Sequence, residues 1–400
     1  MTAKDNLPDF SDLFLDYIEN GVQEALERID PDPNVPQSDE DRERALYVLI
    51  YAVNKPQLSE YTRKLLLLMA PRLERSGYTR DWILVLKKGF ELYKKNRDNS
   101  TAELALHLGI YYQQAGDYSR AGCLFHTSSE IYCEISNSVL EARSLNREAY
   151  VACLQQMYQK AYQHVNKALS LLDRQEKECS ASYQVLGELA MAERKFAKAE
   201  EFFTESLKGR QVHNDIQSIA YSLRDIGNAL LRQNKYVEAA NLYEQSIGFL
   251  QQTNNLVQLA VVRMNLGVVY LLLKQPHRAV EYFQSAERTL QECQDIHHLA
   301  MLFLNKGIAY RDMHEWDSAE SAIKSSISYW KEMCNPPNLI NAMYELGTTM
   351  IRNNRISEGH YVLSDALELL PQIVDDNTKN FHAKNIRFEL ESLPKMDLLK

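Results

Sequence analysis

The sequence predicts an all-α protein in which antiparallel helix pairs stack into a solenoid. Two features of the pattern lead to this class. Small residues recur at a constant spacing along much of the chain, and the apolar residues between them follow the period of a helix. The composition agrees, because the 400 residues include only 14 glycines, about half the usual share.

The repeating unit is defined by a small residue that we call the anchor. The anchors of the five regular units lie 40 residues apart, and two earlier units place Gly109 and Ala149 in the same slot. The repeats therefore extend from about residue 101 to about residue 374. The regular anchors are Gly187, Gly227, Gly267, Gly307 and Gly347.

Each unit has four further slots at fixed distances from its anchor. A bulky or turn residue follows at nine positions, small residues follow at twelve and nineteen, and a large apolar residue stands at sixteen. A small anchor lets two helix backbones approach closely, and the large residue then fills the space beside the crossing. The large residues are Phe125, Val165, Phe203, Tyr243, Phe283, Ile323 and Leu363.

Within a unit, apolar residues recur at steps of three and four, as in Leu266, Val269, Tyr270 and Leu273. This is the period of a helix and not the alternation of a strand. A short polar break, such as the one at 232–235, divides each unit into two helices. Each unit is therefore expected to be one antiparallel helix pair.

This spacing closely resembles that of the tetratricopeptide repeat, over roughly 270 of the 400 residues. The standard unit has about 34 residues and ends its second helix with a proline, which only the seventh unit keeps, as Pro371. Long units of this kind are similar to those of kinesin light chain, spindle-orientation adaptors, Rap-type peptide receptors and the sensor arms of STAND regulators. The resemblance implies a right-handed superhelical solenoid.

Three regions flank the seven repeats at 101–374. Residues 1–38 combine an amphipathic helix, Phe10 to Leu26, with a proline-rich linker. Residues 39–100 form a helical region that resembles a degenerate repeat, and residues 375–400 form a capping helix and tail. The first helix has two alternative roles, as a cap over the first repeat or as a docking helix for a partner.

The expected C-terminal helix covers the last repeat with its apolar residues. These residues are Phe381, Ile386, Phe388 and Leu390.

Composition and charge exclude several classes of function. The net charge of −9 argues against a general affinity for nucleic acid, which requires many Lys and Arg side chains. The N-terminus has no apolar run that could act as a signal peptide, and no apolar stretch is long enough to span a bilayer. We therefore expect a cytoplasmic protein, with six reduced cysteines that form no C-x-x-C pair.

The sequence has no recognisable catalytic motif. It contains no phosphate-binding glycine loop, no H-E-x-x-H helix and no nucleophile elbow. The pair His297 and His298 has no partner at metal-ligand spacing. We expect no catalytic residue, no metal and no cofactor, so the protein is not expected to be an enzyme.

Binding is the chemistry that remains. In tetratricopeptide proteins the first helix of each unit lines a concave groove, and the resemblance places specific residues there. Asparagine can pair with both groups of a peptide bond, and arginine can hold a carboxylate with two hydrogen bonds. Alternatively, these residues are ordinary solvated or inter-helix polar groups. The expected groove residues are Arg143, Asn146, Tyr150, Tyr221, Arg224, Asn228, Arg232, Met264, Asn265, Val268, Asn305 and Arg311.

The fifth unit departs from this polar pattern. Five apolar residues occupy its groove slots and would face solvent on a bare solenoid, which usually marks a contact surface. They are Val261, Met264, Val268, Leu271 and Leu272.

The leading hypothesis is a scaffold or adaptor that holds a peptide or helix of a partner protein in its groove, with a second contact through the first helix. The alternative is a regulatory sensor in bacterial signalling or defence, which responds to a peptide or partner and controls an effector. A third class is an enzyme subunit whose activity depends on another chain.

Overall fold

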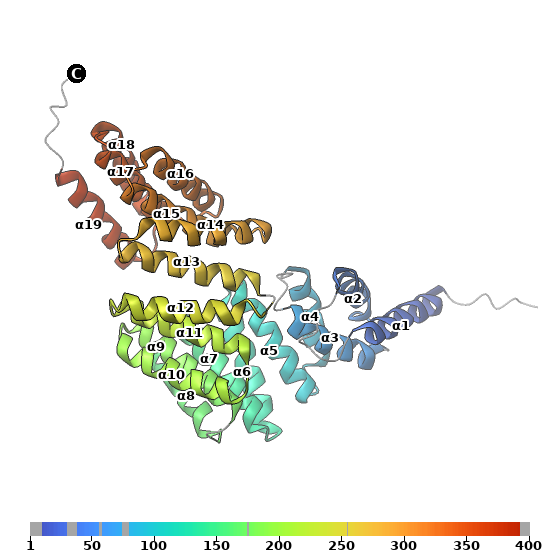
Figure 1. The fold of residues 1–400 in the computed structure, drawn as a ribbon. Helices are drawn as coiled ribbons and strands as arrows, with labels where there is room; N and C mark the ends of the chain where they lie inside the picture. Colours follow the sequence, from blue (N-terminus) through green and yellow to red (C-terminus); the bar gives the residue numbers. More distant parts are fainter. Residues whose placement is uncertain are drawn as a thin grey trace, which may run out of the picture. The chain divides into compact units, whose positions relative to one another are not determined.

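The computed structural model describes residues 10–29, 38–55, 58–73, 80–173, 176–253 and 255–392. Within these ranges the chain forms nineteen α-helices and no β-strand (Figure 1). Consecutive helices pack as antiparallel pairs, so the all-α class is confirmed. The linker expected at 30–36 lies outside the described residues.

The contacts divide the chain into two compact units, Met1–Gly209 and Arg210–Lys400. Seven helix pairs occupy the predicted repeat region, although the division into a flanking helix, a degenerate repeat, an array and a cap stays our interpretation. The helices of the first unit are α1 Phe10–Arg28, α2 Asp39–Ala52, α3 Ser59–Leu73, α4 Arg80–Tyr93, α5 Asn99–Gln114, α6 Tyr118–Glu134, α7 Ser138–Leu154, α8 Tyr158–Ser170, α9 Lys177–Ala192 and most of α10 Phe196–Val212.

The second unit holds four complete pairs and a terminal helix. First helices contact one another directly, and each second helix contacts the first helix of the next pair. The elements are α11 Ile216–Arg232, α12 Tyr236–Leu250, α13 Leu256–Leu272, α14 Pro276–Glu292, α15 Ile296–Asp312, α16 Trp316–Glu332, α17 Pro336–Arg352, α18 Ile356–Glu368, a short 3-10 turn Leu370–Gln372 and α19 Asp376–Ser392.

The turn inside each pair follows one scheme. In all seven pairs the first helix ends five residues after its anchor, and the bulky residue at nine begins the second helix. In each turn a backbone N–H donates back to the carbonyl five residues earlier, at 2.8–3.0 Å, which satisfies a helix-terminal carbonyl. The residue before this donor has a positive φ, which glycine adopts freely; only Gly116 among the seven is a glycine.

The glycine anchors lie where the prediction placed them, directly beneath the large residue of the same pair. A Cβ added to Gly227 would lie 2.8 Å from the Tyr243 ring, and one added to Gly267 would lie 2.5 Å from the Phe283 ring. Real side chains do not approach this closely, so only glycine fits at these crossings. The predicted role of the anchors is therefore confirmed.

The second helix pair, α7 and α8, shows the same constraint in reverse. Its anchor is Ala149, which carries a methyl group, and its large residue is Val165, the smallest of the seven. Both side chains are fully buried in one cluster. A larger anchor is thus accompanied by a smaller partner, as packing at constant volume requires.

The small slot at nineteen has a second purpose where it holds serine. Each serine hydroxyl is fully buried and donates to a carbonyl of the first helix in the same pair, 26 residues earlier. This bond ties the two helices and satisfies the hydroxyl. The four bonds, at 2.7–2.8 Å, join Ser128 to Ala102, Ser206 to Ser180, Ser246 to Ala220, and Ser326 to Ala300.

The two terminal helices are each buried on one side only. Helix α1 packs against α2 and α3 through Ile18, Val22 and Ala25, while α3 and α4 provide contacts with α5 of the first repeat. Helix α1 therefore covers the N-terminal helices and is not the main cover of the first repeat.

Helix α19 packs against α17 and α18, as expected of a cap. It buries Ile386 and His382, and Leu390 lies against the same cluster. The prediction is wrong for Phe381 and Phe388, which are 61% and 72% exposed. Their positions on the helix direct them away from Ile386, and this exposed side of α19 faces solvent.

The anchor constraint predicts a size exchange between two positions. Gly267→Ala combined with Phe283→Val copies the anchor and the large residue of the second helix pair. The loss of unfolding free energy in the double variant should therefore be smaller than the sum of the two single losses, by about 1 kcal/mol or more. Urea unfolding followed by circular dichroism measures this coupling.

Gly248→Ala provides the control for this cycle, because a Cβ there meets nothing within 4 Å. It should show no coupling with Phe283→Val. Strict additivity of Gly267→Ala and Phe283→Val would contradict the packing assignment.

Burial of His382 predicts that α19 is sensitive to acid. Burial lowers the pKa of His382, so the folded state binds this proton less readily than the unfolded state does. Its contribution to stability is therefore complete above about pH 6.5 and declines as the pH falls toward the folded pKa. Amide hydrogen exchange in 376–392, corrected for intrinsic rates, should show less protection at about pH 5 than at about pH 7.

His382→Leu should abolish this loss of protection, since the buried position then carries no titrating group. An unchanged pH response in the variant would assign the effect to other groups.

Candidate functional site: the first-helix face of the second unit

The candidate site lies along the first helices α11, α13, α15 and α17. We number positions on these helices from the anchor glycine, which makes equivalent residues of successive pairs comparable. The position five residues after the anchor, the +5 row, is exposed in all four helices. The +5 row consists of Arg232, Leu272, Asp312 and Arg352.

The predicted residue Tyr221 belongs to a hydrogen-bond cluster that joins α11 to α13. Its hydroxyl accepts from Gln217 Nε2 at 2.6 Å and from Asn255 Nδ2 at 2.7 Å. Asn255 also caps α13, because its Oδ1 accepts from the Gln258 backbone N–H. Tyr221 is therefore held in place by the start of the next helix.

Arg224 also links the first helices α11 and α13. Its Nε donates to Asp225 at 2.9 Å and its Nη1 donates to Gln258 of α13 at 2.7 Å. The guanidinium lies over the Tyr221 ring, 5.2 Å from its centroid. These contacts leave the side chain 22% exposed, so Arg224 is not the open basic contact that the sequence suggested.

Asn228 and Asn265 meet on the same face. Asn228 Oδ1 accepts from Tyr243 Oη at 2.6 Å and from Asn265 Nδ2 at 3.4 Å. Burial raises the pKa of Tyr243, so its hydroxyl stays protonated and remains a donor. Both asparagines are partly exposed. Within the described part of the chain, Asn228 Nδ2 and Asn265 Oδ1 have no hydrogen-bond partner.

The expected apolar surface of the fifth unit is largely absent. Met264 is only 2% exposed and Leu271 only 8%, so the prediction that they face solvent is wrong. Met264 occupies the same position relative to its anchor as Arg224, which bonds to the neighbouring first helix. Val261 and Val268 are half-buried, and Leu272 alone in this set is well exposed.

The sixth and seventh pairs are joined through Arg311. This side chain is 9% exposed, and its Nη1 donates to Glu345 Oε2 at 2.6 Å and to Thr348 Oγ1 at 3.2 Å. Removing one partner of such a buried pair leaves an uncompensated charge. Arg311 therefore stabilises the stack, whereas Asn305 on α15 remains partly exposed.

The three remaining predicted residues belong to the first unit. Asn146 is buried, its Oδ1 accepts from Ser182 at 2.9 Å, and its Nδ2 donates to the Glu178 carbonyl at 3.5 Å. Asn146 thus joins α7 to α9, while Arg143 and Tyr150 are half-buried. The other nine predicted residues lie in the second unit.

Two further clusters were not found from the sequence. Glu148 of α7 is buried, accepts from Ser129 Oγ at 2.6 Å, and lies 3.3 Å from His126 Nδ1 and 3.6 Å from His164 Nε2. Burial lowers the pKa of His164. These residues lie on three helices and come together only through the packing of two pairs.

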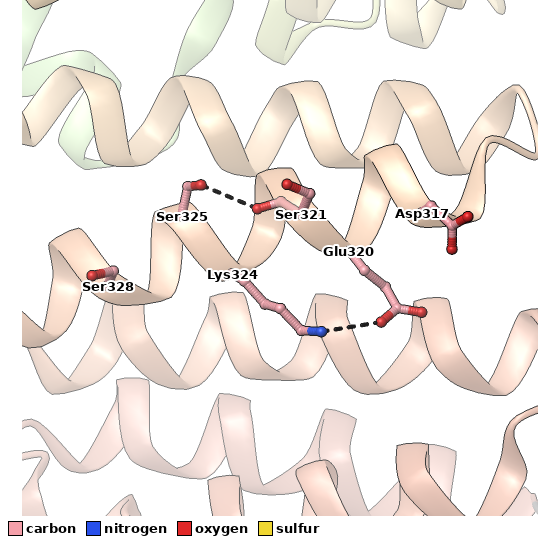
Figure 2. Close-up of a pocket in the computed structure, with 6 residues that line it drawn as sticks. All are labelled: Asp317, Glu320, Ser321, Lys324, Ser325 and Ser328. Carbon is pink, nitrogen blue, oxygen red and sulfur yellow. Dashed lines mark hydrogen bonds and ion pairs between the residues drawn. The ribbon is translucent and has the colours of Figure 1, made fainter.

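The second cluster is a surface hollow on α16 (Figure 2). It is lined by Asp317, Glu320, Ser321, Lys324, Ser325 and Ser328. Lys324 pairs with Glu320 at 3.3 Å, and Ser325 Oγ donates to the Ser321 carbonyl at 3.1 Å. Glu320 also pairs with Arg355, which lies before α18. The hollow lies on a second helix and contains none of the first-helix residues.

No group of three or more His, Cys, Asp or Glu side chains within the described ranges is placed to hold a metal ion. Among these helices, none combines the length and apolar character that crossing a membrane requires.

Comparison with known proteins supports the fold of stacked helix pairs. The tetratricopeptide repeat family model matches residues 218–292, which contain α12, α13 and α14 and most of α11. The structure is therefore that of a tetratricopeptide-like repeat protein, and the resemblance drawn from the spacing is confirmed. We found no match among curated protein sequences.

Many solved structures share the fold, including the three that follow. A STAND protein with a tetratricopeptide repeat sensor from Pyrococcus horikoshii aligns with TM-score 0.63 and 14% identity, over 94% of this chain and 56% of that protein. This chain therefore spans little more than half of that protein's length. A Rap protein complexed with competence and sporulation factor gives TM-score 0.56 and 12% identity, over 94% and 99% of the two chains.

The third is aspartyl phosphate phosphatase F from Bacillus subtilis, with TM-score 0.56 and 13% identity, over 94% of this chain and 97% of that one. Identities this low establish the shared fold alone.

The contacts of Arg224 predict that its charge reversal destabilises the protein. Arg224→Glu would place a carboxylate beside Asp225 and break the bond to Gln258, at a cost of about 1–3 kcal/mol. Arg232→Glu changes the same charge at an exposed position of the same helix and should stay within about 0.5 kcal/mol of wild type. Thermal unfolding of the two variants tests the difference. Equal melting temperatures would contradict a stabilising role for the Arg224 contact with Gln258.

Proposed function

We propose that the protein is a non-enzymatic adaptor that binds an extended peptide segment of a partner protein along the first helices of its second unit. The observation that carries this proposal is the pair Asn228 and Asn265. The two residues are in contact, and one amide donor and one amide acceptor of the pair have no partner among the described residues, which is the complement of a peptide C=O and N–H. A tetratricopeptide-like fold supports a role in protein binding or regulatory sensing.

The +5 row would supply the selectivity. Arg232 and Arg352 are exposed cations, Asp312 is an exposed anion, and Leu272 is apolar and 44% exposed. A peptide that lies across α11 and α13 could place an acidic side chain at Arg232 and an apolar side chain at Leu272. The expected partner is thus a segment with mixed acidic and apolar character.

A second candidate function is regulatory sensing, in which a bound peptide or partner changes the arrangement of the repeats and controls an effector. The similarity to a Rap protein solved with a signalling factor, and to a STAND protein with a repeat sensor, supports it. Small-angle scattering with and without the bound segment separates the two functions, because an adaptor keeps its dimensions and a sensor changes them. We further propose a cytoplasmic location and a second protein contact through α1.

Quantitative pull-down tests the proposed face. Proteins that bind the wild-type chain should be recovered with roughly fivefold to thirtyfold lower affinity by Arg232→Glu, which corresponds to about 1–2 kcal/mol for reversal of an exposed contact charge. Asn265→Ala should weaken the binding of the same proteins, because it removes an amide that would pair with the peptide backbone.

Arg288→Glu on the second helix α14 is the matched control, because it makes the same charge change at an exposed position away from this face. Equal recovery by Arg232→Glu and Arg288→Glu would remove the first-helix face from the function.

A further inference from the structure

The two terminal helices expose aromatic surfaces that the proposed peptide site does not use. On α1 and α2, six apolar side chains are 39–71% exposed, and we call them the N-terminal aromatic face: Leu13, Phe14, Tyr17, Tyr47, Ile50 and Tyr51. On α19, Phe381 and Phe388 are exposed with Lys384 between them, and we call these three the α19 outer face. A terminal element of a repeat stack normally has a polar outer side.

The N-terminal aromatic face is continuous across two packed helices. The Phe14 and Tyr51 rings meet edge to face with centroids 6.0 Å apart, and Tyr47 and Tyr51 meet at 5.2 Å. Lys55 Nζ lies 5.8 Å from the centroid of the Phe14 ring. These rings therefore form one surface that already accepts a cation from the same chain.

The charges beside the two faces are complementary. Exposed carboxylates, Asp16 and Glu43, flank the N-terminal aromatic face, and α1 and α2 together carry nine acidic and three basic residues. Exposed cations, Lys384 and Arg387, lie on α19 near its two phenylalanines, although the whole helix carries three basic and three acidic residues. Opposite charges around two apolar surfaces favour their association and set its orientation.

The spacing of the two faces also agrees. Phe381 and Phe388 are seven residues apart, which separates them by about 10 Å along one side of a helix. Packed neighbouring helices such as α1 and α2 have axes about 8–10 Å apart. One phenylalanine can therefore contact α1 while the other contacts α2.

We propose that the N-terminal aromatic face of one molecule binds the α19 outer face of a second copy of this chain. The contact is heterologous, so each added molecule brings one unused face, and the association either continues head to tail or closes into a ring. The interface is small, and it forms at micromolar or higher concentration. This association is independent of the peptide site on α11 and α13.

Analytical ultracentrifugation of the full chain tests the proposal. The average mass of the wild type should rise with concentration, from about 10 to about 200 μM, and reach or pass twice the monomer mass. Tyr17→Lys and Phe388→Glu should each remain monomeric over this range, because each introduces a charge that repels the opposing face. Tyr361→Lys, at an equally exposed aromatic residue on α18, should behave as wild type.

A mixture of the two blocked variants distinguishes the head-to-tail contact from other occupants. The Tyr17→Lys chain keeps its α19 outer face and the Phe388→Glu chain keeps its N-terminal aromatic face, so the equimolar mixture should form dimers and stop at twice the monomer mass. Circular dichroism of each variant confirms that the fold is intact.

Three results would overturn the proposal. A wild type that stays monomeric at the highest concentration would assign the two faces to other partners. Association that Phe388→Glu abolishes and Tyr17→Lys leaves intact would indicate a symmetric α19 contact. Blocked variants that remain monomeric when mixed would exclude pairing of the two faces.

Discussion

The close crossing of the two helices in each repeat is the contact on which the rest of the structure depends. At six of the seven anchors a glycine lies against a large side chain of the second helix, and no room remains for a Cβ. This contact sets the distance between the helices of a pair. The buried serine bonds, such as Ser246 to the Ala220 carbonyl, are short enough to form only because that distance is small.

The distance within a pair also determines what the first helices present to their neighbours. Once the pairs are stacked, the position three residues before the anchor points at the next first helix. It then holds Asn146 and Arg224 as inter-helix contacts, and Met264 as a buried side chain. The polar groups available to a ligand are those that this stacking does not use. They include the charged residues of the +5 row, together with Asn228 Nδ2 and Asn265 Oδ1.

The sequence was sufficient for the fold and only partly sufficient for the site. The anchors, the start of every second helix and the packing of Tyr243 over Gly227 follow from spacing, because each depends on residues of one pair. The exposure of Met264, Arg224 and Arg311 depends on side chains of the next pair, and no single repeat contains that information. The Glu148 cluster with His126 and His164 could not be predicted for the same reason, since it forms across two pairs.

The bond between Asn228 and Tyr243 connects ligand recognition to the stability of the repeat. Tyr243 fills the space over Gly227, and its buried hydroxyl donates to the amide oxygen of a residue on the candidate binding face. A ligand that competes for Asn228 Oδ1 must leave the phenol without its acceptor inside the protein, at a cost of about 1–3 kcal/mol. A ligand that instead uses Asn228 Nδ2 keeps the oxygen fixed toward the phenol. The contact between Tyr243 and Gly227 therefore favours a ligand that presents an amide oxygen to Asn228 Nδ2. By thermodynamic linkage, such a ligand stabilises the helix crossing on which it depends.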